Sequence, residues 1–394
     1  MWLTDARVVD VVRGQIRDGV SVEISGGRIG AIQKQPGAGE RRSLGGRYLV
    51  PGLISVHTHL SVVYPFSAHD ENENPGLTVL RAYQRAQDAL HAGVTTIRCV
   101  HELNRADLLL AEAARAGWAD VPRIVGAGRA LSTTDGHGDG GIGCAIVDGP
   151  EAFREAALAE LDAGCSHIKV FITGGIAKLG ETFDHPEMSL EEMRATVDAA
   201  SERDTYVVAH AASSLAINRA LDAGIRSFEH AYDLDEDTAR RMAAEGVFLT
   251  PTLCVTRSQE WMKWKGFEDF QIETSLQVGP MHLASIRRAV AAGVTMVNGT
   301  DYPPGDPIGG TSVAVHEMNL MEGAGLHPKL ALAGATSNAA RLLGLESEIG
   351  TVEQGKMADL VAVDENPLAD VSAMRDISFV MQSGRVVRDD RPAP

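Results

Sequence analysis

A pair of histidines separated by a single residue is the first feature that could do chemistry. His57 and His59 close an apolar run at residues 53–56, and such a run is typical of a buried strand. Residues i and i+2 of a strand point to the same side, so both imidazoles could bind one divalent metal ion. A pair of this kind also occurs by chance, so a metal site requires further ligands.

Four more residues with metal-binding or titratable side chains lie at the ends of other strand-like runs. They are Lys169, His210, His230 and Asp301. Each also has a structural explanation: the lysine could extend its amine to water, the histidines could be hydrogen-bonded in the core, and the aspartate could cap a helix. A lysine inside an apolar strand is costly to desolvate. Together with the histidine pair, the four residues predict one metal centre.

The runs that carry these residues alternate with helix-like segments such as 190–202 and 214–223, several of which end in an Ala-Gly pair that suits a helix C-cap. We expect eight strands, at 53–57, 95–100, 123–128, 167–172, 206–210, 227–230, 247–252 and 295–300. The run at 247–252 is the least regular, because Thr-Pro-Thr interrupts it. Eight parallel strands close a barrel whose strand C-termini converge on one face. The sequence therefore predicts an α/β fold, a (β/α)8 TIM-like barrel.

The two ends of the chain differ from this pattern. Residues 1–50 and 350–394 contain short strand-like runs separated by glycine turns, and neither end is long enough to fold alone. We expect them to pair into one small β-sandwich domain, with the barrel formed by residues 51–349.

Composition limits the class of protein and its partners. The chain has 394 residues, of which 44% are hydrophobic and 23% charged, as in a soluble globular protein. The net charge is 36 − 53 = −17, which repels phosphate backbones and anionic lipids, so we expect no nucleic-acid or membrane partner. The sequence lacks a signal-peptide pattern and a long apolar run, and its four cysteines are scattered. These features predict a cytoplasmic protein with reduced thiols. As partners we expect a small-molecule substrate and other copies of the same chain in a homo-oligomer.

Over nearly the whole chain, the motifs resemble those of the amidohydrolase superfamily. They are Pro-Gly-Leu-Ile-Ser-Val-His-Thr-His at 51–59, Ile-Lys-Val-Phe around Lys169, Val-Val-Ala-His ending at His210, Phe-Glu-His-Ala at 228–231, Gly-Thr-Asp at 299–301 and Gly-Thr-Val-Glu-Gln-Gly-Lys-Met-Ala-Asp-Leu at 350–360. One departure is Ser55, which stands where many relatives have Asp, although that position is not a ligand.

The resemblance implies two divalent metal ions, for which zinc is expected, while manganese and cobalt suit the same ligands. His57, His59 and Asp301 would hold one ion, and His210 and His230 the second. Lys169, converted by carbon dioxide into a carbamate, would bridge the two ions. A carbamate replaces a cation by an anionic oxygen ligand, which makes this bridge chemically reasonable.

Within the superfamily, the chain is most similar to the imidazolonepropionase-like and prolidase-like branch, whose carboxypeptidases act on dipeptides and N-acyl amino acids. The motifs are Thr-Asp-Gly-His-Gly-Asp at 134–139, Thr-Gly-Gly at 173–175 and Thr-Pro-Thr-Leu at 250–253. By this likeness His137 contacts the scissile carbonyl and Tyr232 the substrate carboxylate. Alternatively, His137 orders a glycine-rich loop and Tyr232 covers the barrel rim.

The implied reaction is amide hydrolysis by a hydroxide that bridges the two ions, with His137 polarising the carbonyl and Asp301 carrying the proton to the leaving amine. The same centre could hydrolyse a cyclic amide, a carbamate or urea, a lactone, another ester or a phosphotriester. Deaminases of the superfamily instead use one ion and a glutamate shortly after the third histidine, whereas Ala-Ala-Ser follows His210 here. A non-catalytic scaffold would be expected to have lost ligands.

Substrate preference depends on loops whose structure the sequence does not predict, at residues 64–75 and 256–279. The second loop contains Trp261, Met262, Trp264 and Phe267. This cluster could form a hydrophobic lid over the pocket or a dimer contact.

Overall fold

Eight parallel strands form the centre of the molecule in a computed structural model, which describes residues 1–390. Three make one sheet: β6 (Leu53–Thr58), β7 (Val94–Cys99) and β8 (Arg123–Val125). Five more belong to a second sheet: β11 (Ile168–Phe171), β12 (Val207–Ser213), β13 (Ser227–Asp233), β14 (Phe248–Thr250) and β15 (Thr295–Met296). Each overlaps a predicted strand. Two short strands, β9 (Ala130–Ser132) and β10 (Cys144–Ile146), extend the second sheet beside β11.

Backbone hydrogen bonds connect the two parallel sheets on both sides. Ser166 N donates to Gly126 O at 2.8 Å after β8, and Val56 N of β6 donates to Asn298 O at 2.8 Å after β15. The strands are rich in β-branched and apolar residues because both their faces are buried. The predicted (β/α)8 fold is confirmed.

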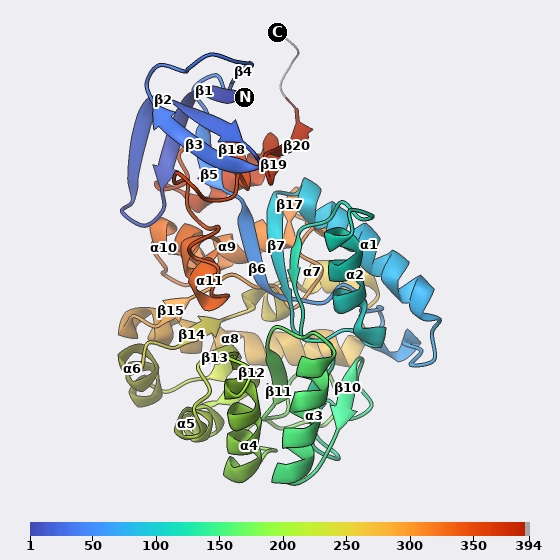
Figure 1. Ribbon diagram of the computed structural model, residues 1–394. Coiled ribbons are helices and arrows are strands. Elements are labelled where there is room, and N and C mark those ends of the chain that lie inside the picture. The colour runs from blue at the N-terminus through green and yellow to red at the C-terminus, as the bar shows by residue number, and fades with distance from the viewer. Residues whose placement is uncertain (391–394) are drawn as a thin grey trace.

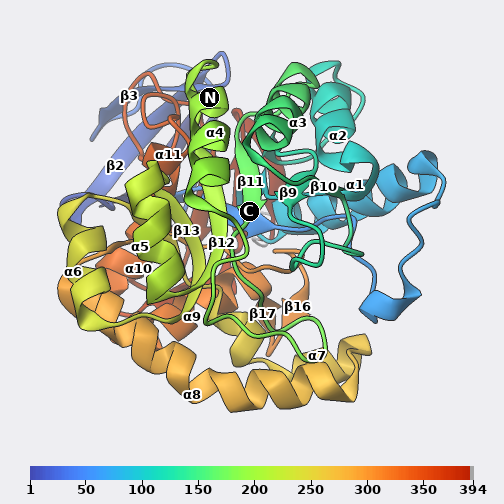
Figure 2. The same cartoon turned by 90° about the horizontal axis from the view of Figure 1, so that it is seen from below.

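Helices lie around the outside of these strands (Figures 1 and 2). They are α1 (Pro75–His91), α2 (Ala106–Arg115), α3 (Pro150–Asp162), α4 (Leu190–Ser201), α5 (Ser214–Ala223), α6 (Glu236–Ala244), α7 (Gln259–Lys265), α8 (Asp269–Ala292), α9 (Val313–Gly323), α10 (Pro328–Gly334) and α11 (Ser337–Leu342). The predicted Ala-Gly ends follow α1, α3, α5 and α8, and all four glycines have positive φ, the backbone conformation in which such a helix end terminates. Short 3₁₀ turns lie at Phe66–Ala68, Leu103–Arg105, Leu253–Thr256 and Val371–Asp376.

The two ends of the chain combine in one eight-stranded sheet at one end of the barrel (Figure 1). Its strands are β1 (Trp2–Asp10), β2 (Gln15–Ser25), β3 (Arg28–Gln33), β4 (Arg41–Ser43), β5 (Tyr48–Pro51), β18 (Leu360–Val363), β19 (Phe379–Gln382) and β20 (Arg385–Asp389). β18 pairs antiparallel with β5, and the sheet encloses a core of its own that includes Leu3, Leu49 and Phe379. β5 leads directly into β6, so this sheet fixes the start of the strand that carries His57. The domain limits at residues 50 and 350 stay a prediction.

Two observations bear on the predicted environment. None of the helices within residues 1–390 combines the length and the apolar character needed to cross a bilayer. The four cysteines, Cys99, Cys144, Cys165 and Cys254, form no disulfide with one another.

A short hairpin of β16 (Pro307–Ile308) and β17 (Thr311–Ser312) follows the last barrel strand.

Candidate metal centre

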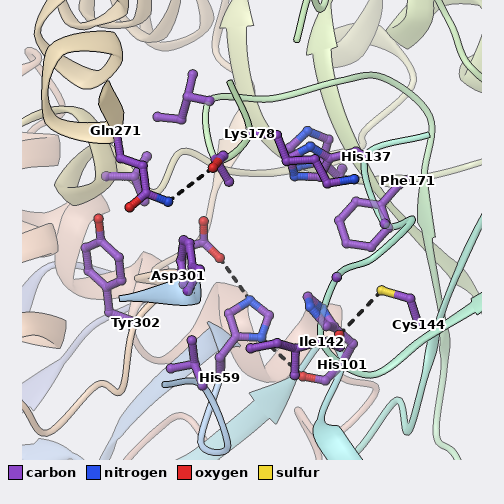
Figure 3. A pocket seen from close by; sticks show the side chains of 18 of the residues that line it. His59, His101, His137, Ile142, Cys144, Phe171, Lys178, Gln271, Asp301 and Tyr302 are labelled. Atoms are coloured by element: carbon purple, nitrogen blue, oxygen red, sulfur yellow. Dashed lines mark hydrogen bonds and ion pairs between the residues drawn. The ribbon is translucent and has the colours of Figure 1, made fainter. Parts of the chain in front are cut away.

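The six residues predicted as metal ligands line one cavity of about 220 Å³ at the C-terminal ends of the barrel strands. β6 carries His57, with His59 just after it; β11, β12 and β13 carry Lys169, His210 and His230, and Asp301 follows β15. Figure 3 shows Asp301 and His59 pointing toward each other in this cavity, with His137 on the opposite wall. The fold therefore brings all six residues together, as expected for strand ends of a barrel.

The tightest part of the cluster consists of His57, His230 and Asp301, whose ligand atoms all lie within 4.8 Å of one another. Asp301 Oδ1 lies 3.0 Å from His57 Nε2 and 2.9 Å from His59 Nε2. The ring of His210 extends the cluster, since its centroid is 4.5 Å from that of His230. Nitrogen and carboxylate ligands in this arrangement suit a divalent cation such as zinc.

In each imidazole of the cluster, the ring nitrogen that points away from the cavity has a hydrogen-bonding partner. Nδ1 of His57 lies 2.5 Å from a Glu229 carboxylate oxygen, that of His59 3.1 Å from His101 O, and that of His230 2.6 Å from Thr252 Oγ1. His210 is reversed, with Nε2 lying 3.1 Å from Gly174 O. The partners thereby leave Nε2 of three rings and Nδ1 of the fourth for a ligand, the usual way in which outer groups orient metal-binding histidines.

Lys169 is buried beside the Phe171 ring, with its Nζ 5.3 Å from the ring centroid, and without a hydrogen bond in the described part of the chain that would explain its position. Its side chain is 1% exposed, and within residues 1–390 its Nζ has no hydrogen-bond partner. The amine therefore does not reach water, which excludes the explanation of a lysine extended to the surface. Burial lowers the pKa of Lys169 to about 8. A buried amine without an acceptor is costly, so this residue is the strongest single indication of a missing partner group.

Burial and neighbouring charges also set the protonation of the other groups. Burial holds the pKa of His210 and of His230 well below its ordinary value, so both rings are neutral and able to bind a cation. Burial raises the pKa of Asp301, but His57 and His59 outweigh it and hold the pKa well below the usual range. Asp301 is also no helix cap: it follows β15 in a turn with φ +60°, a conformation that costs a residue other than glycine of order 1 kcal/mol.

The two predicted substrate-binding residues also lie at the cavity. His137 stacks on His210 with ring centroids 4.4 Å apart, and its Nδ1 lies 2.8 Å from a carboxylate oxygen of Glu181. Tyr232 stacks on His230 at 5.3 Å. Burial raises the pKa of Tyr232 well above 10, so its hydroxyl stays a neutral donor.

Sequence reasoning missed several residues of the site. Arg98 and Glu229 form a fully buried ion pair at 2.7 Å beneath the histidines. Lys178 lines the cavity and its Nζ donates to Gly136 O at 3.0 Å and to Asp139 O. The sequence could have indicated the ion pair, because Arg98 and Glu229 both lie in predicted strands. A charged side chain inside a buried strand requires a partner of opposite charge.

The aromatic cluster of the α7–α8 region packs over the cavity. Trp261, Met262 and Phe267 are 5%, 3% and 8% exposed, whereas Trp264 is 66% exposed. Met262 and Phe267 line the cavity, and Phe267 stacks on Tyr64 with centroids 4.6 Å apart. This packing within one chain favours a lid over a dimer contact for all of the cluster except Trp264.

Comparison with known proteins agrees with this geometry. The family model that matches is the amidohydrolase family, over residues 48–387. Ochratoxinase of Aspergillus niger is 27% identical over 387 residues, covering 86% of this chain and 75% of that protein. Imidazolonepropionase of Rhizorhabdus wittichii is 28% identical over 400 residues, covering 92% of this chain and 93% of that protein. A solved prolidase complexed with N-methylphosphonate-L-proline superposes with a TM-score of 0.89 at 28% identity. The match covers 98% of this chain and 99% of the prolidase.

The family match and the similarity to an imidazolonepropionase and a prolidase confirm the resemblance that the sequence motifs indicated. This chain therefore belongs to the amidohydrolase family.

Proposed function

We propose that this hydrolase cleaves the amide bond of a dipeptide or an N-acyl amino acid at a centre of two divalent ions, with Asp301 as the proton shuttle. The observation that carries the proposal is the amine of Lys169, which has no hydrogen-bond partner within residues 1–390 and lines the cavity together with four imidazoles and a carboxylate. The prolidase that this chain resembles is complexed with N-methylphosphonate-L-proline, in which a phosphonate is joined to an amino acid. That ligand supports an amide next to an amino acid as the bond cleaved.

The donor atoms of the cavity support a centre of two ions. His57, His59 and Asp301 would hold the first, and His210 and His230 the second, with the carbamate of Lys169 between them. A carbamate would give the buried amine the bonding partners that it lacks, because its oxygens bind cations. Zinc suits these nitrogen and oxygen ligands, as do manganese and cobalt. Two bound ions would supply polarisation of the carbonyl and a water whose pKa falls from ~15.7 toward about 7.

The side chains of this chain supply the remaining steps. Asp301, whose Oδ1 lies 3.0 Å from His57 Nε2 and 2.9 Å from His59 Nε2, would take the proton of the attacking water and pass it to the leaving nitrogen. His137, whose Nδ1 lies 2.8 Å from a carboxylate oxygen of Glu181, would contact and polarise the carbonyl oxygen. The hydroxyl of Tyr232 would donate to the substrate carboxylate.

Other hydrolytic substrates are the principal alternatives. A cyclic amide, a carbamate or urea, a lactone, another ester or a phosphotriester would use the same ligands. Deamination is disfavoured because the alanines after His210 provide no acid or base. A non-catalytic scaffold is disfavoured because none of the six ligand residues has been lost.

A mass-spectrometric screen tests the proposed substrate class. Reconstituted protein shown to carry two ions would be incubated with a mixed library of dipeptides and N-acyl amino acids, with Asp301→Asn as the control. We expect particular members to disappear, and free amino acids to form, only with the unaltered protein. If no member is consumed, the proposed substrate class is wrong, and cyclic amides, carbamates and esters become the candidates.

The apolar wall of the cavity should determine which side chain is accepted. Phe267→Ala removes part of that wall, so we expect KM for substrates with large apolar side chains to rise by roughly 10-fold, because about 1.5 kcal/mol of apolar contact is lost. Steady-state kinetics measure the change. Trp264→Ala is the matched control, because this neighbouring aromatic side chain is exposed. Equal KM values for the two variants would contradict the role of this region as a lid.

A further inference from the structure

A charged pair lies buried beneath the metal centre, between strands on opposite sides of the barrel. Arg98 of β7 and Glu229 of β13 are both 0% exposed, and Arg98 Nη2 donates to Glu229 Oε1 at 2.7 Å. Burying two charges gains little stability over apolar residues of the same size. The pair therefore requires an explanation other than stability, and its contacts provide one.

Glu229 contacts the ring of His57, and Arg98 contacts the backbone next to it. Glu229 uses its second oxygen, Oε2, to accept a hydrogen bond from His57 Nδ1 at 2.5 Å. Arg98 Nε donates to Val56 O at 2.5 Å, the carbonyl that immediately precedes His57. Two further bonds from Arg98 Nη1, to Tyr206 and Ser227 at 3.3 Å each, fix the guanidinium in place. The pair thus holds the backbone and the ring of one ligand.

Among the four histidines of the cluster, only His57 has a carboxylate at its outer nitrogen. The other partners are carbonyl oxygens for His59 and His210 and a hydroxyl for His230. An ionised carboxylate accepts hydrogen bonds and cannot donate them, so it keeps the proton of His57 on Nδ1. The lone pair is then on Nε2, which faces Asp301 at 3.0 Å.

We propose that Arg98 and Glu229 are positioning residues that hold His57 in its Nδ1-protonated form, orient Nε2 toward the ion shared with Asp301, and so set the affinity of the centre for that ion. Outer partners of this kind change metal affinity by roughly 10- to 100-fold. The inference rests on the proposed ion site, and it does not depend on the proposed substrate.

The test is Co²⁺ binding to the full chain, measured by competition with a chelator and by the visible absorption of the bound ion. Glu229→Gln keeps the size of the side chain but removes its charge, so we expect the affinity for one of the ions to fall roughly 10- to 100-fold and the absorption bands to shift. Glu160→Gln is the matched control: Glu160 is also buried and paired with arginines, Arg105 and Arg129, but touches no residue of the cluster. Its Co²⁺ affinity should equal that of the unaltered protein.

Glu229→Gln leaves Arg98 without a counter-ion, so a second variant, Glu229→Gln with Arg98→Met, removes both charges together. It should show the same loss of Co²⁺ affinity. A pair that only stabilises the fold would change the unfolding temperature and leave the Co²⁺ affinity and spectrum as they were; that result, in either folded variant, overturns the inference. If the unaltered protein binds no Co²⁺, the proposed ion site itself is wrong. This result differs from the one that overturns only the positioning role of Arg98 and Glu229.

Discussion

Asp301→Asn is expected to lower kcat by roughly 100- to 10,000-fold, the range that general acid–base catalysis contributes. The carboxylate lies between His57 and His59 and can receive a proton, whereas an amide cannot. The variant should still fold, because asparagine tolerates the left-handed backbone at φ +60°. The backbone bonds of Thr300 and Asp301 to His57 O do not involve the side chain.

The measurement is kcat on a substrate found in the library screen, together with circular dichroism and the ion content of the variant. Circular dichroism separates a chemical effect from unfolding. Turnover close to that of the unaltered protein would rule out the proton-shuttle role of Asp301.

Lys169→Met is expected to leave the stability of the protein unchanged or higher while its turnover falls. Methionine has a similar length and no charge, so it removes the cost of burying an amine without a partner, and the unfolding temperature should stay the same or rise. The bridging carbamate can no longer form, so we expect the protein to retain about one ion instead of two. Turnover should fall by roughly 100-fold or more, because several kcal/mol of transition-state charge stabilisation depend on the ions.

Ion content by elemental mass spectrometry and thermal unfolding are the two readouts. Lys178→Met is the matched control, because Lys178 lines the same cavity but its ammonium already has two carbonyl acceptors. The control should keep both ions. A Lys169→Met protein that keeps both ions and its turnover would show that the lysine is no ligand.

The barrel strands could be predicted because they are short apolar runs between helices with recognisable ends, a pattern that is local in the sequence. The predicted strand at 295–300 shows where local pattern fails. β15 ends at Met296, and beyond it Asn298 O accepts from Val56 N and Thr300 N donates to His57 O, so this segment still bonds to β6 without being a regular strand. That partner lies far away in the sequence, and the pattern of residues 295–300 holds no information about it.

The ligand residues could be predicted because side-chain type and position at strand ends were sufficient. Their outer partners could not, since the contact of His57 with Glu229 joins residues 172 positions apart, and only the closure of the barrel brings them together. The packing of α7 and α8 over the cavity depends in the same way on tertiary contacts, such as that of Phe267 with Tyr64.

Titration of metal-free protein with Zn²⁺ tests the central claim most directly. The full chain would be stripped by a chelator and reloaded stepwise, and release of the free amino acid from an amide found in the screen would be followed at each step. Our account predicts no hydrolysis by the stripped protein, a rate that saturates near two ions per chain, and no recovery in Asp301→Asn. Full hydrolysis by the stripped protein would contradict it.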